Sequence, residues 1–218
     1  MRISKRIREI ETLIPKGSIL ADIGCDHAYL DCLAIMTGKC DKCYACDVVE
    51  GPLECAKRTI KEYNCEGKVI PILSNGFDNV PNDANVAVIS GMGYETMKMI
   101  LEANDISQFD RLILQANNDV DDLRRWVLGN GYTIVDERIV HEGHYYMILV
   151  VEKGEDTYTE DDYLFGKFVN DQTFVDYWTF RKNRLLNIIP QLKDETQIQE
   201  FTNLLNRINK KIEGAVTK

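Results

Sequence analysis

Two aspartates stand in a turn where nucleotide-binding folds usually have bare backbone. Residues 18–31 read as a buried strand, a turn and the start of a helix, and Asp22 and Asp26 flank the single glycine of this run, Gly24. A dinucleotide site needs G-x-G-x-x-G here so that the backbone can approach a pyrophosphate, and two carboxylates would repel such an anion. S-adenosylmethionine carries a sulfonium, an ammonium and no phosphate. The turn therefore favours S-adenosylmethionine over NAD or ATP.

A third carboxylate, Asp47, ends the next predicted strand, 25 residues after Asp22. A carboxylate at that place can accept hydrogen bonds from both ribose hydroxyls of an adenosine. Asp47 could instead cap the helix predicted to start near Gly51. The two roles are compatible, so Asp47 is a candidate ribose ligand.

Two more glycine-containing turns follow predicted strands. In the turn at 74–78, Asn75 could read the purine edge, Gly76 would allow close approach, and Phe77 could stack on the base. The turn Ser90-Gly-Met-Gly93 follows the fourth strand, where a methyl acceptor should enter. Because the carboxyl ends of parallel strands meet at one edge of a sheet, we expect these turns to form one site.

Two residues of the first turn have a second interpretation. His27 could pack on or hydrogen-bond a ligand edge, or it could simply begin the helix. Asp26 could serve as a helix cap, which is a common place for aspartate. Both alternatives stay open at the level of sequence.

The remaining cysteines and histidines, residue types that often bind metals or catalyse reactions, are better explained by structural roles. Cys40, Cys43 and Cys46 are spaced three apart in a predicted strand, so neighbours in the series point to opposite faces, and the fourth cysteine of a ferredoxin pattern is missing. We expect no metal there. His141 and His144 flank Gly143 in a predicted hairpin turn without an evident acid–base partner, so solvated turn histidines are the better interpretation.

The elements that must position these residues alternate between strand and helix. Fully apolar strands in such an alternation predict a Rossmann-like α/β fold, with a mostly parallel seven-stranded sheet covered on both faces. Pro71 favours a place near a sheet edge. The expected strands are 19–23, 42–47, 68–73, 85–89, 111–115, 132–140 and 144–151, the last two antiparallel; the expected helices are 3–14, from 28 onward, 52–63, 94–103 and one that Asp119 could cap.

The C-terminal part has a different pattern. An acidic stretch, 154–162, lacks apolar rhythm, so we place a domain boundary there and predict domains 1–153 and 154–218. Two helical apolar stripes follow, separated near Pro190, which predicts an antiparallel helical hairpin. A short helix could precede it near 160–169.

Charge and composition limit the classes of partner that the chain can have. The 218 residues carry a net charge of −9, yet residues 172–218 hold eight Lys/Arg against five Asp/Glu, and Arg2, Lys5, Arg6 and Arg8 form a basic N-terminal face. Such surfaces can engage phosphates or can be ordinary solvated helix faces. Without an apolar run near 18 residues or a signal-peptide pattern, we expect a cytoplasmic protein without a membrane partner, and a monomer. Seven cysteines, mostly within apolar segments, suggest reduced thiols.

Over its full length the chain resembles the bacterial tRNA adenine-N1 methyltransferases that modify adenine 22, in the D-loop region. The family usually has Ser at Cys25, Glu at Asp47, Pro at Ala116 and Gly at Tyr94. The motifs that carry the resemblance are Asp22-Ile-Gly-Cys-Asp-His-Ala-Tyr-Leu30, Val48-Val-Glu-Gly-Pro52, Ser90-Gly-Met-Gly93, Leu112-Ile-Leu-Gln-Ala-Asn117 and Asp122-Leu-Arg-Arg-Trp126.

The resemblance implies a class I methyltransferase domain that uses S-adenosylmethionine, a coiled-coil-like C-terminal domain that helps hold tRNA, and N1 of adenine as the methyl acceptor. We expect Asp26, Tyr29 and Asn117 on the catalytic side. The alternatives are a methyltransferase with another acceptor, or a non-catalytic RNA-binding module on the same fold. The predicted cofactor-binding residues are Asp22, Gly24, His27, Asp47, Val48, Asn75, Gly76, Phe77 and Gly91.

Overall fold

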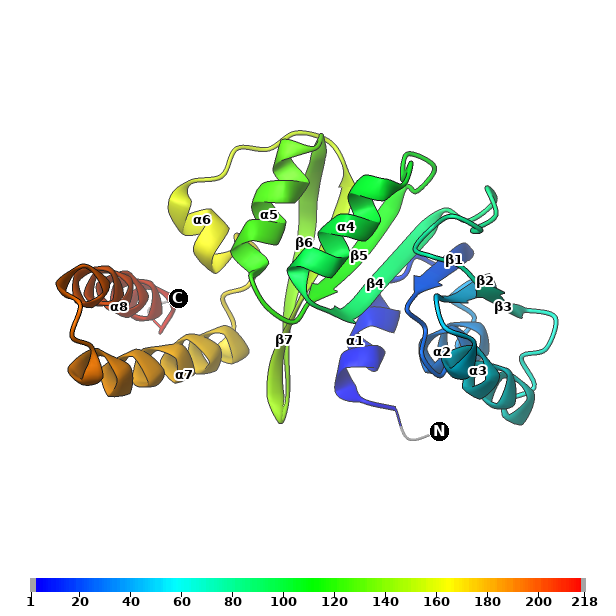
Figure 1. Ribbon diagram of the computed structural model, residues 1–218, viewed down its shortest axis with the longest axis horizontal. Coiled ribbons are helices and arrows are strands. Elements are labelled where there is room, and N and C mark those ends of the chain that lie inside the picture. Colours follow the sequence, from blue (N-terminus) through cyan, green and yellow to red (C-terminus); the bar gives the residue numbers. More distant parts are fainter. Residues whose placement is uncertain (1–2, 217–218) are drawn as a thin grey trace. The chain divides into compact units, whose positions relative to one another are not determined.

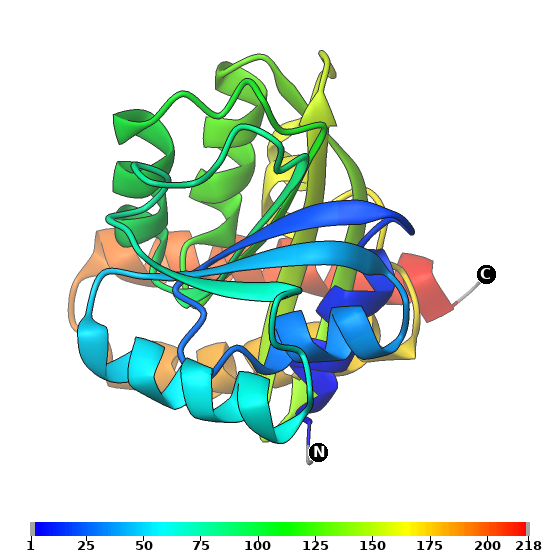
Figure 2. The same ribbon diagram turned by 90° about the vertical axis from the view of Figure 1, so that its right-hand side faces the viewer.

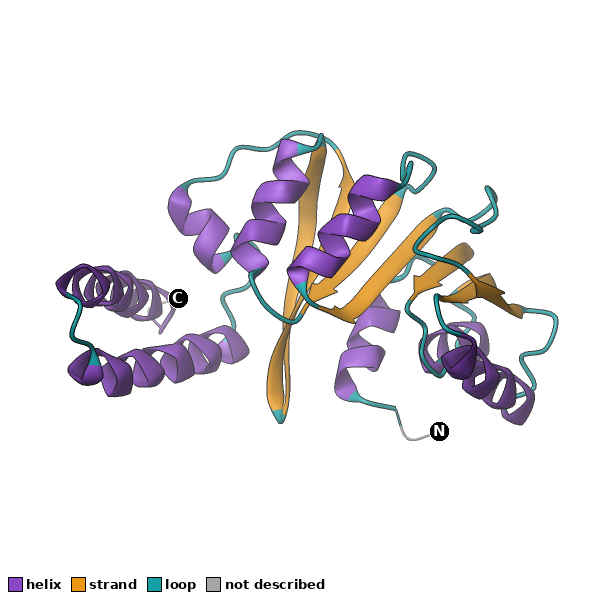
Figure 3. Cartoon of the chain, in the orientation of Figure 1, coloured by secondary structure: helices purple, strands orange, loops and turns teal. Residues whose placement is uncertain are grey.

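A seven-stranded sheet is the framework of the computed structural model, which describes residues 3–216; Arg2 of the predicted basic face lies outside them. The strand order is β3-β2-β1-β4-β5-β7-β6, with β7 antiparallel to both its neighbours and the other pairs parallel (Figures 1 and 3). The predicted mostly parallel sheet is thereby confirmed. The strands are β1 (Ser18–Ile23), β2 (Cys40–Asp47), β3 (Val69–Leu73), β4 (Val86–Met92), β5 (Arg111–Ala116), β6 (Tyr132–Glu142) and β7 (His144–Lys153).

Helices cover both faces of the sheet, because its strands are apolar on both sides (Figure 2). One core holds the apolar residues of the first three helices, and the other holds those of the next three. Cys43 belongs to the first core and Cys46 to the second, as expected for strand residues three apart. Cys40 instead shares the first core with Cys43, because the pairing of β2 with β1 shifts register between Cys40 and Lys42. The helices are α1 (Lys5–Leu13), α2 (Tyr29–Met36), α3 (Glu50–Glu62), α4 (Tyr94–Ala103), α5 (Val120–Gly129) and α6 (Glu160–Phe165).

Most sequence predictions for this part are confirmed, including α4 at its predicted bounds and Pro71 in the edge strand β3. The predicted cap of α5 is wrong in one respect. Asp119 occupies the N-cap position, but its backbone is left-handed, with φ of +50°, and its side chain makes no capping hydrogen bond.

The chain divides into two compact units between Lys167 and Phe168, later than the predicted boundary after residue 153. The difference arises because α6 is tied to the first unit. Arg124 donates a hydrogen bond to the Tyr163 carbonyl at 2.8 Å, and the Arg125 guanidinium lies 4.2 Å from the centre of the Tyr163 ring. The acidic stretch before α6 is therefore a loop of the first unit.

The second unit is the predicted helical hairpin. It consists of α7 (Gln172–Ile188), a short 3-10 turn at Ile189–Gln191 and α8 (Glu195–Val216). Phe174, Trp178 and Leu185 of α7 and Ile208 of α8 are buried. Across residues 3–216, no helix has the length and apolarity needed to cross a membrane.

Candidate active site

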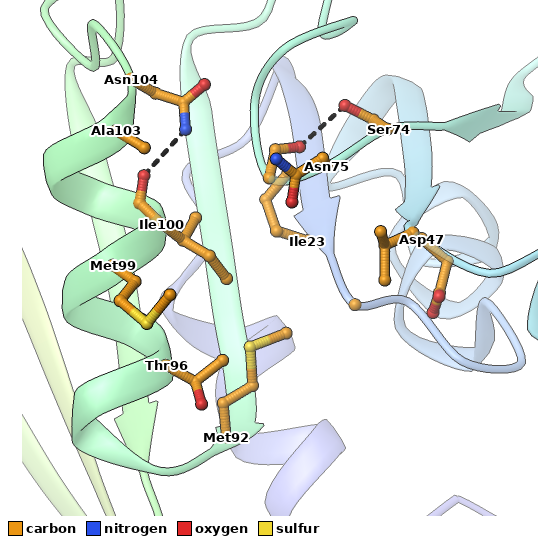
Figure 4. Close-up of a pocket in the computed structure, with 13 residues that line it drawn as sticks. Ile23, Asp47, Ser74, Asn75, Met92, Thr96, Met99, Ile100, Ala103 and Asn104 are labelled. Atoms are coloured by element: carbon orange, nitrogen blue, oxygen red, sulfur yellow. Dashed lines mark hydrogen bonds between the residues drawn. The ribbon is translucent and has the colours of Figure 1, made fainter.

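Two pockets meet at the carboxyl edge of the sheet, and both are lined by Gly24, Asp47 and Met92. The first, called here the α4 pocket, has a volume of about 330 Å³ and lies between α4 and the turns after β2 and β3 (Figure 4). The second, the α1 pocket, has a volume of about 350 Å³ and reaches from the first turn to α1. Together they form an elongated site at the place where α/β sheets bind nucleotides.

The α4 pocket is apolar on one wall and polar on the other. Met99 and Ile100 of α4 face it from one side, and Asp47 and Asn75 lie across from them (Figure 4). Asp47 accepts a hydrogen bond from the backbone N–H of Val49 at 3.0 Å through Oδ1, which leaves Oδ2 for a ligand. An apolar slot beside a carboxylate suits an adenine and its ribose.

Gly24 lies where the two pockets meet, and it has no side chain that would fill the space between them. Its backbone is left-handed, with φ of +77°, and a Cβ placed on it would overlap Cε of Met92. A side chain at this position would therefore strain the left-handed backbone and would displace the end of the flexible Met92 side chain. The requirement for glycine in the sequence motif has a direct steric cause.

The turn after Gly24 holds its side chains in an unusual backbone conformation. Asp26 and Ala28 both have positive φ, +50° and +54°, which costs a non-glycine residue roughly 1–2 kcal/mol. The Asp26 carboxylate is 73% exposed, and Nε2 of His27 lies 3.6 Å from its Oδ1. Tyr29, the first residue of α2, places its ring 5.6 Å from the His27 ring. Ala28 occupies the N-cap position of α2 without a side-chain capping hydrogen bond, so Asp26 does not cap this helix. Asp26, His27 and Tyr29 line the α1 pocket.

Asp22 supplies the most perturbed acid of the site. Its side chain lines the α1 pocket although the residue is only 5% exposed. Burial raises the pKa of Asp22 to about 7, while a hydrogen bond with Asp31 and the charge of Arg6 lower it and Asp47 raises it. Asp31 is fully buried, and burial together with the Asp22 charge raises its pKa well above the ordinary value. The two carboxyl groups must therefore share a proton near neutral pH.

A hydrogen-bond network fixes the acceptor side of the α1 pocket. The buried Gln115 accepts from Nη1 of Arg6 at 2.9 Å and from the Gly91 N–H at 3.1 Å, and it donates to Asn117 at 3.1 Å. Asn117 donates to the Gly91 carbonyl at 2.8 Å. The glycine turn after β4 is thus held by side chains from β5 and α1.

The comparisons with known proteins agree with this geometry. The model of the tRNA (adenine(22)-N(1))-methyltransferase family matches residues 20–214. The chain belongs to this family. It is 28% identical to the tRNA (adenine(22)-N(1))-methyltransferase of Bacillus subtilis, over 98% of this chain and 95% of that protein.

Two solved structures of similar chains hold the cofactor or its product. Streptococcus pneumoniae Sp1610 in complex with S-adenosyl-L-methionine has a TM-score of 0.89 and 32% identity, covering 96% of this chain and 99% of that one. M. capricolum TrmK in complex with S-adenosyl-homocysteine has a TM-score of 0.88 and 29% identity, covering 98% of this chain and 99% of that one. The fold is therefore that of a methyltransferase that uses S-adenosylmethionine.

The residues of this chain fit that cofactor. The α4 pocket offers an apolar slot with a carboxylate, and the α1 pocket offers acids but no glycine-rich phosphate loop. The buried thiol of Cys25 also lines the α1 pocket, and burial raises its pKa, so it stays neutral. Among the described residues no cluster of potential metal ligands is found, and the seven cysteines are free.

The structure brings most predicted residues together, but Phe77 and Asn117 line neither pocket. Phe77 lines neither pocket, because the Ser74 hydroxyl bonds to the Gly76 carbonyl and curls the turn, so that Phe77 is buried 5.0 Å from the Phe109 ring. Asn117 is exposed beside the α1 pocket rather than lining it. The predicted residues that line a pocket are Asp22, Gly24, Asp26, His27, Tyr29, Asp47, Val48, Asn75, Gly76 and Gly91.

Three contributors to the site were not predicted from the sequence. The pocket-facing side of α4, which includes Thr96 and Met99, had no signal because periodicity does not tell which face of a helix lies at the sheet edge. Arg6 was noted only as part of a basic face, although it lines the α1 pocket. Asp31 did have a signal, since it is a lone acid among Leu30, Cys32 and other apolar helix residues.

Proposed function

We propose that this chain transfers the methyl group of S-adenosylmethionine to N1 of adenine 22 of tRNA. The observation that carries the proposal is the pair of pockets joined at Gly24, with acids at the junction, in a chain that matches the family over residues 20–214. Because its substrate is tRNA, the enzyme works in the cytoplasm.

The α4 pocket holds the adenosine part of the cofactor. Asp47 accepts from the ribose hydroxyls through the oxygen that does not bind Val49, and Asn75 reads the purine edge. Asp22 attracts the positively charged half in the α1 pocket. When bound, the cofactor supplies an electrophilic methyl group on its sulfonium.

The acceptor side needs positioning more than acid–base chemistry. Adenine N1 has an in-plane lone pair, so no strong base is required, and holding it in line with the methyl–sulfur bond is worth up to roughly 7–11 kcal/mol. N1 lies on the Watson–Crick edge, so the base must be unpaired and turned into the α1 pocket. Tyr29 lines this pocket, while Asn117 holds the Gly91 carbonyl at its rim.

Asp26 favours the positive charge that the methylated base acquires. A carboxylate about 4 Å from a cation contributes about 1 kcal/mol in water and about 4 kcal/mol at an effective dielectric of 20. Asp26 is mostly exposed in the free protein, so its contribution grows when the bound RNA covers it.

The decisive experiment maps the methyl group. Purified protein is incubated with methyl-labelled cofactor and unmodified tRNA transcripts, and N1-methyladenine is located by the stop it causes in primer extension, because the methyl group blocks the pairing edge. We expect one stop, at adenine 22, and none in a matched transcript with guanine there. Label transfer to other nucleotides only, or no transfer to any tRNA, would refute the assignment.

A further inference from the structure

The β6–β7 hairpin extends beyond the strand beside it at the edge of the sheet where the site lies. Only residues 112–114 of β5 pair with β7, at 149–151, whereas β6 and β7 stay paired with each other as far as Glu142 and His144. Figure 1 shows the tip of this hairpin reaching past the ends of the other strands. Since β6 runs parallel to β5, the tip lies at the carboxyl edge, on the same side as the two pockets.

The N-terminal helix is attached to this tip. The backbone N–H of Lys5 donates to Oε2 of Glu142 at 2.8 Å, and Glu9 lies 3.6 Å from the Arg138 guanidinium. Glu142 and Glu9 therefore already have partners in these contacts. Among the residues that the structure describes, Lys5 and Arg8 take part in no ion pair, and both are exposed.

Arg6 connects this region to the α1 pocket. Its guanidinium lies 5.0 Å from the centre of the Tyr146 ring in β7, and it also lines the pocket, where Gln115 holds it. Helix α1, the hairpin and the acceptor side of the site are therefore continuous.

The hairpin tip also presents stacked rings. His141 and Tyr145 are cross-strand partners whose ring centres are 4.3 Å apart, with planes inclined by 19°. His141 and His144 are exposed, and Tyr145 is half-buried. A cross-strand pair can serve only to stabilise a hairpin. Here the pair stands beside unpaired cations, which is the combination that RNA-binding surfaces use for bases and phosphates.

We propose that the α1–hairpin surface, formed by Lys5, Arg8, His141, His144 and Tyr145, binds the RNA strand next to the methylated adenosine. Lys5 and Arg8 contact phosphates, and the His141–Tyr145 pair stacks on a neighbouring unpaired base. The inference rests on the proposed function, and it gives the methyltransferase unit a tRNA contact of its own.

The charge part of the proposal is tested with a double variant, Lys5→Glu with Arg8→Glu, in the full-length chain. The matched control is Lys61→Glu with Lys68→Glu, which changes the same charge on exposed residues at the opposite edge of the sheet. Affinity for an unmodified tRNA transcript is measured at several salt concentrations. We expect at least tenfold weaker binding for the first variant, a salt slope smaller by about 1.5, and less than a twofold change for the control.

The stacking part is tested with His141→Ala combined with Tyr145→Ala. We expect the KM for tRNA to rise about fivefold or more, with little change in kcat at saturating tRNA, and His141→Tyr to keep the wild-type KM because it retains a ring. Calorimetric binding of S-adenosyl-homocysteine, unchanged in each variant, shows that the fold is intact.

The outcomes separate the two proposals. Suppose that the wild type methylates tRNA, that Lys5→Glu with Arg8→Glu binds tRNA like the wild type, and that His141→Ala with Tyr145→Ala keeps the wild-type KM. The surface assignment is then wrong and the proposed function stands. Failure of the proposed function appears in the wild type alone, as an absence of methyl transfer to tRNA.

Discussion

We expect the buried pair of Asp22 and Asp31 to make cofactor binding sensitive to pH. Asp22 lines the α1 pocket with a pKa of about 7, and it attracts a positively charged ligand only when ionised. Asp31 makes a hydrogen bond that lowers the pKa of Asp22. Replacing Asp31 by leucine removes this bond, whereas asparagine keeps a donor of nearly the same shape.

The size of the effect follows from the titration of Asp22. With a pKa of about 7, the ionised fraction falls about tenfold between pH 8 and pH 6, so the affinity of the wild type should fall by about the same factor. A hydrogen bond to a charged group is worth about 1.5–3 kcal/mol, or roughly one to two pKa units. Asp31→Leu should therefore weaken cofactor binding about 3- to 25-fold at pH 7.5, and about twofold or less at pH 9.

The stability of the free protein should fall as the pH rises, whereas the affinity for the cofactor should increase. The pKa of Asp22 is raised in the folded state, so the stability linked to its protonation is complete below about pH 4 and is lost as the pH rises through about 7. Bound cofactor offsets this loss. The rise in Tm caused by S-adenosylmethionine should consequently be larger at pH 8 than at pH 6.

Calorimetry with S-adenosylmethionine between pH 6 and pH 9, at constant ionic strength, measures these affinities. The amino group of the cofactor titrates in the same range, but it is common to all proteins compared, so differences between variants report on Asp22. Asp31→Asn should stay within about twofold of the wild type at pH 7.5. Equal losses for the Asn and Leu variants, or a wild-type affinity that is flat between pH 6 and pH 8, would refute the reasoning.

Four other substitutions test separate parts of the structure. Gly24→Ala should weaken cofactor binding at least tenfold in calorimetry, because the left-handed backbone is strained and the new methyl group displaces Met92, which lines both pockets. Asp47→Asn should weaken it about 10- to 100-fold, because a charged acceptor for the ribose is lost. Glu137→Gln should lower the free energy of unfolding in urea by about 3–5 kcal/mol, because Arg124 is 3% exposed and would keep an unpaired charge. Asp26→Ala should reduce kcat more than cofactor affinity; equal losses would make Asp26 a cofactor ligand.

The sheet and its turns could be predicted because their signals are local. Apolar runs that end in glycine or aspartate mark the carboxyl ends of parallel strands, and topology then brings those ends to one edge. Gly24, Asp47 and Gly91 do line pockets at that edge. The family resemblance added the identity of the substrate, which no strand pattern contains.

What could not be predicted depends on contacts between distant segments. Arg6 reaches the site because α1 packs beside the hairpin, and its partner Gln115 is 109 residues away. Phe77 was expected against the base, but a hydrogen bond within its own turn directs it into the core. The helix α6 was assigned to the C-terminal part because its acidic approach resembled a linker, whereas Arg124 binds it to the first unit.

The charge movement in the reaction explains why Asp22 and Asp26 should have different roles. Methyl transfer moves a positive charge from sulfur to the adenine ring, so a carboxylate equally distant from both atoms would stabilise both states alike and leave the barrier unchanged. Asp22 is buried at the end of β1, and under the proposed function we expect it to act before transfer, through affinity for the cofactor. Asp26 is exposed, and its attraction for the new cation becomes strong only when the acceptor displaces water from it. The loss of kcat in Asp26→Ala should therefore be large with tRNA, which covers the turn, and small with free adenosine.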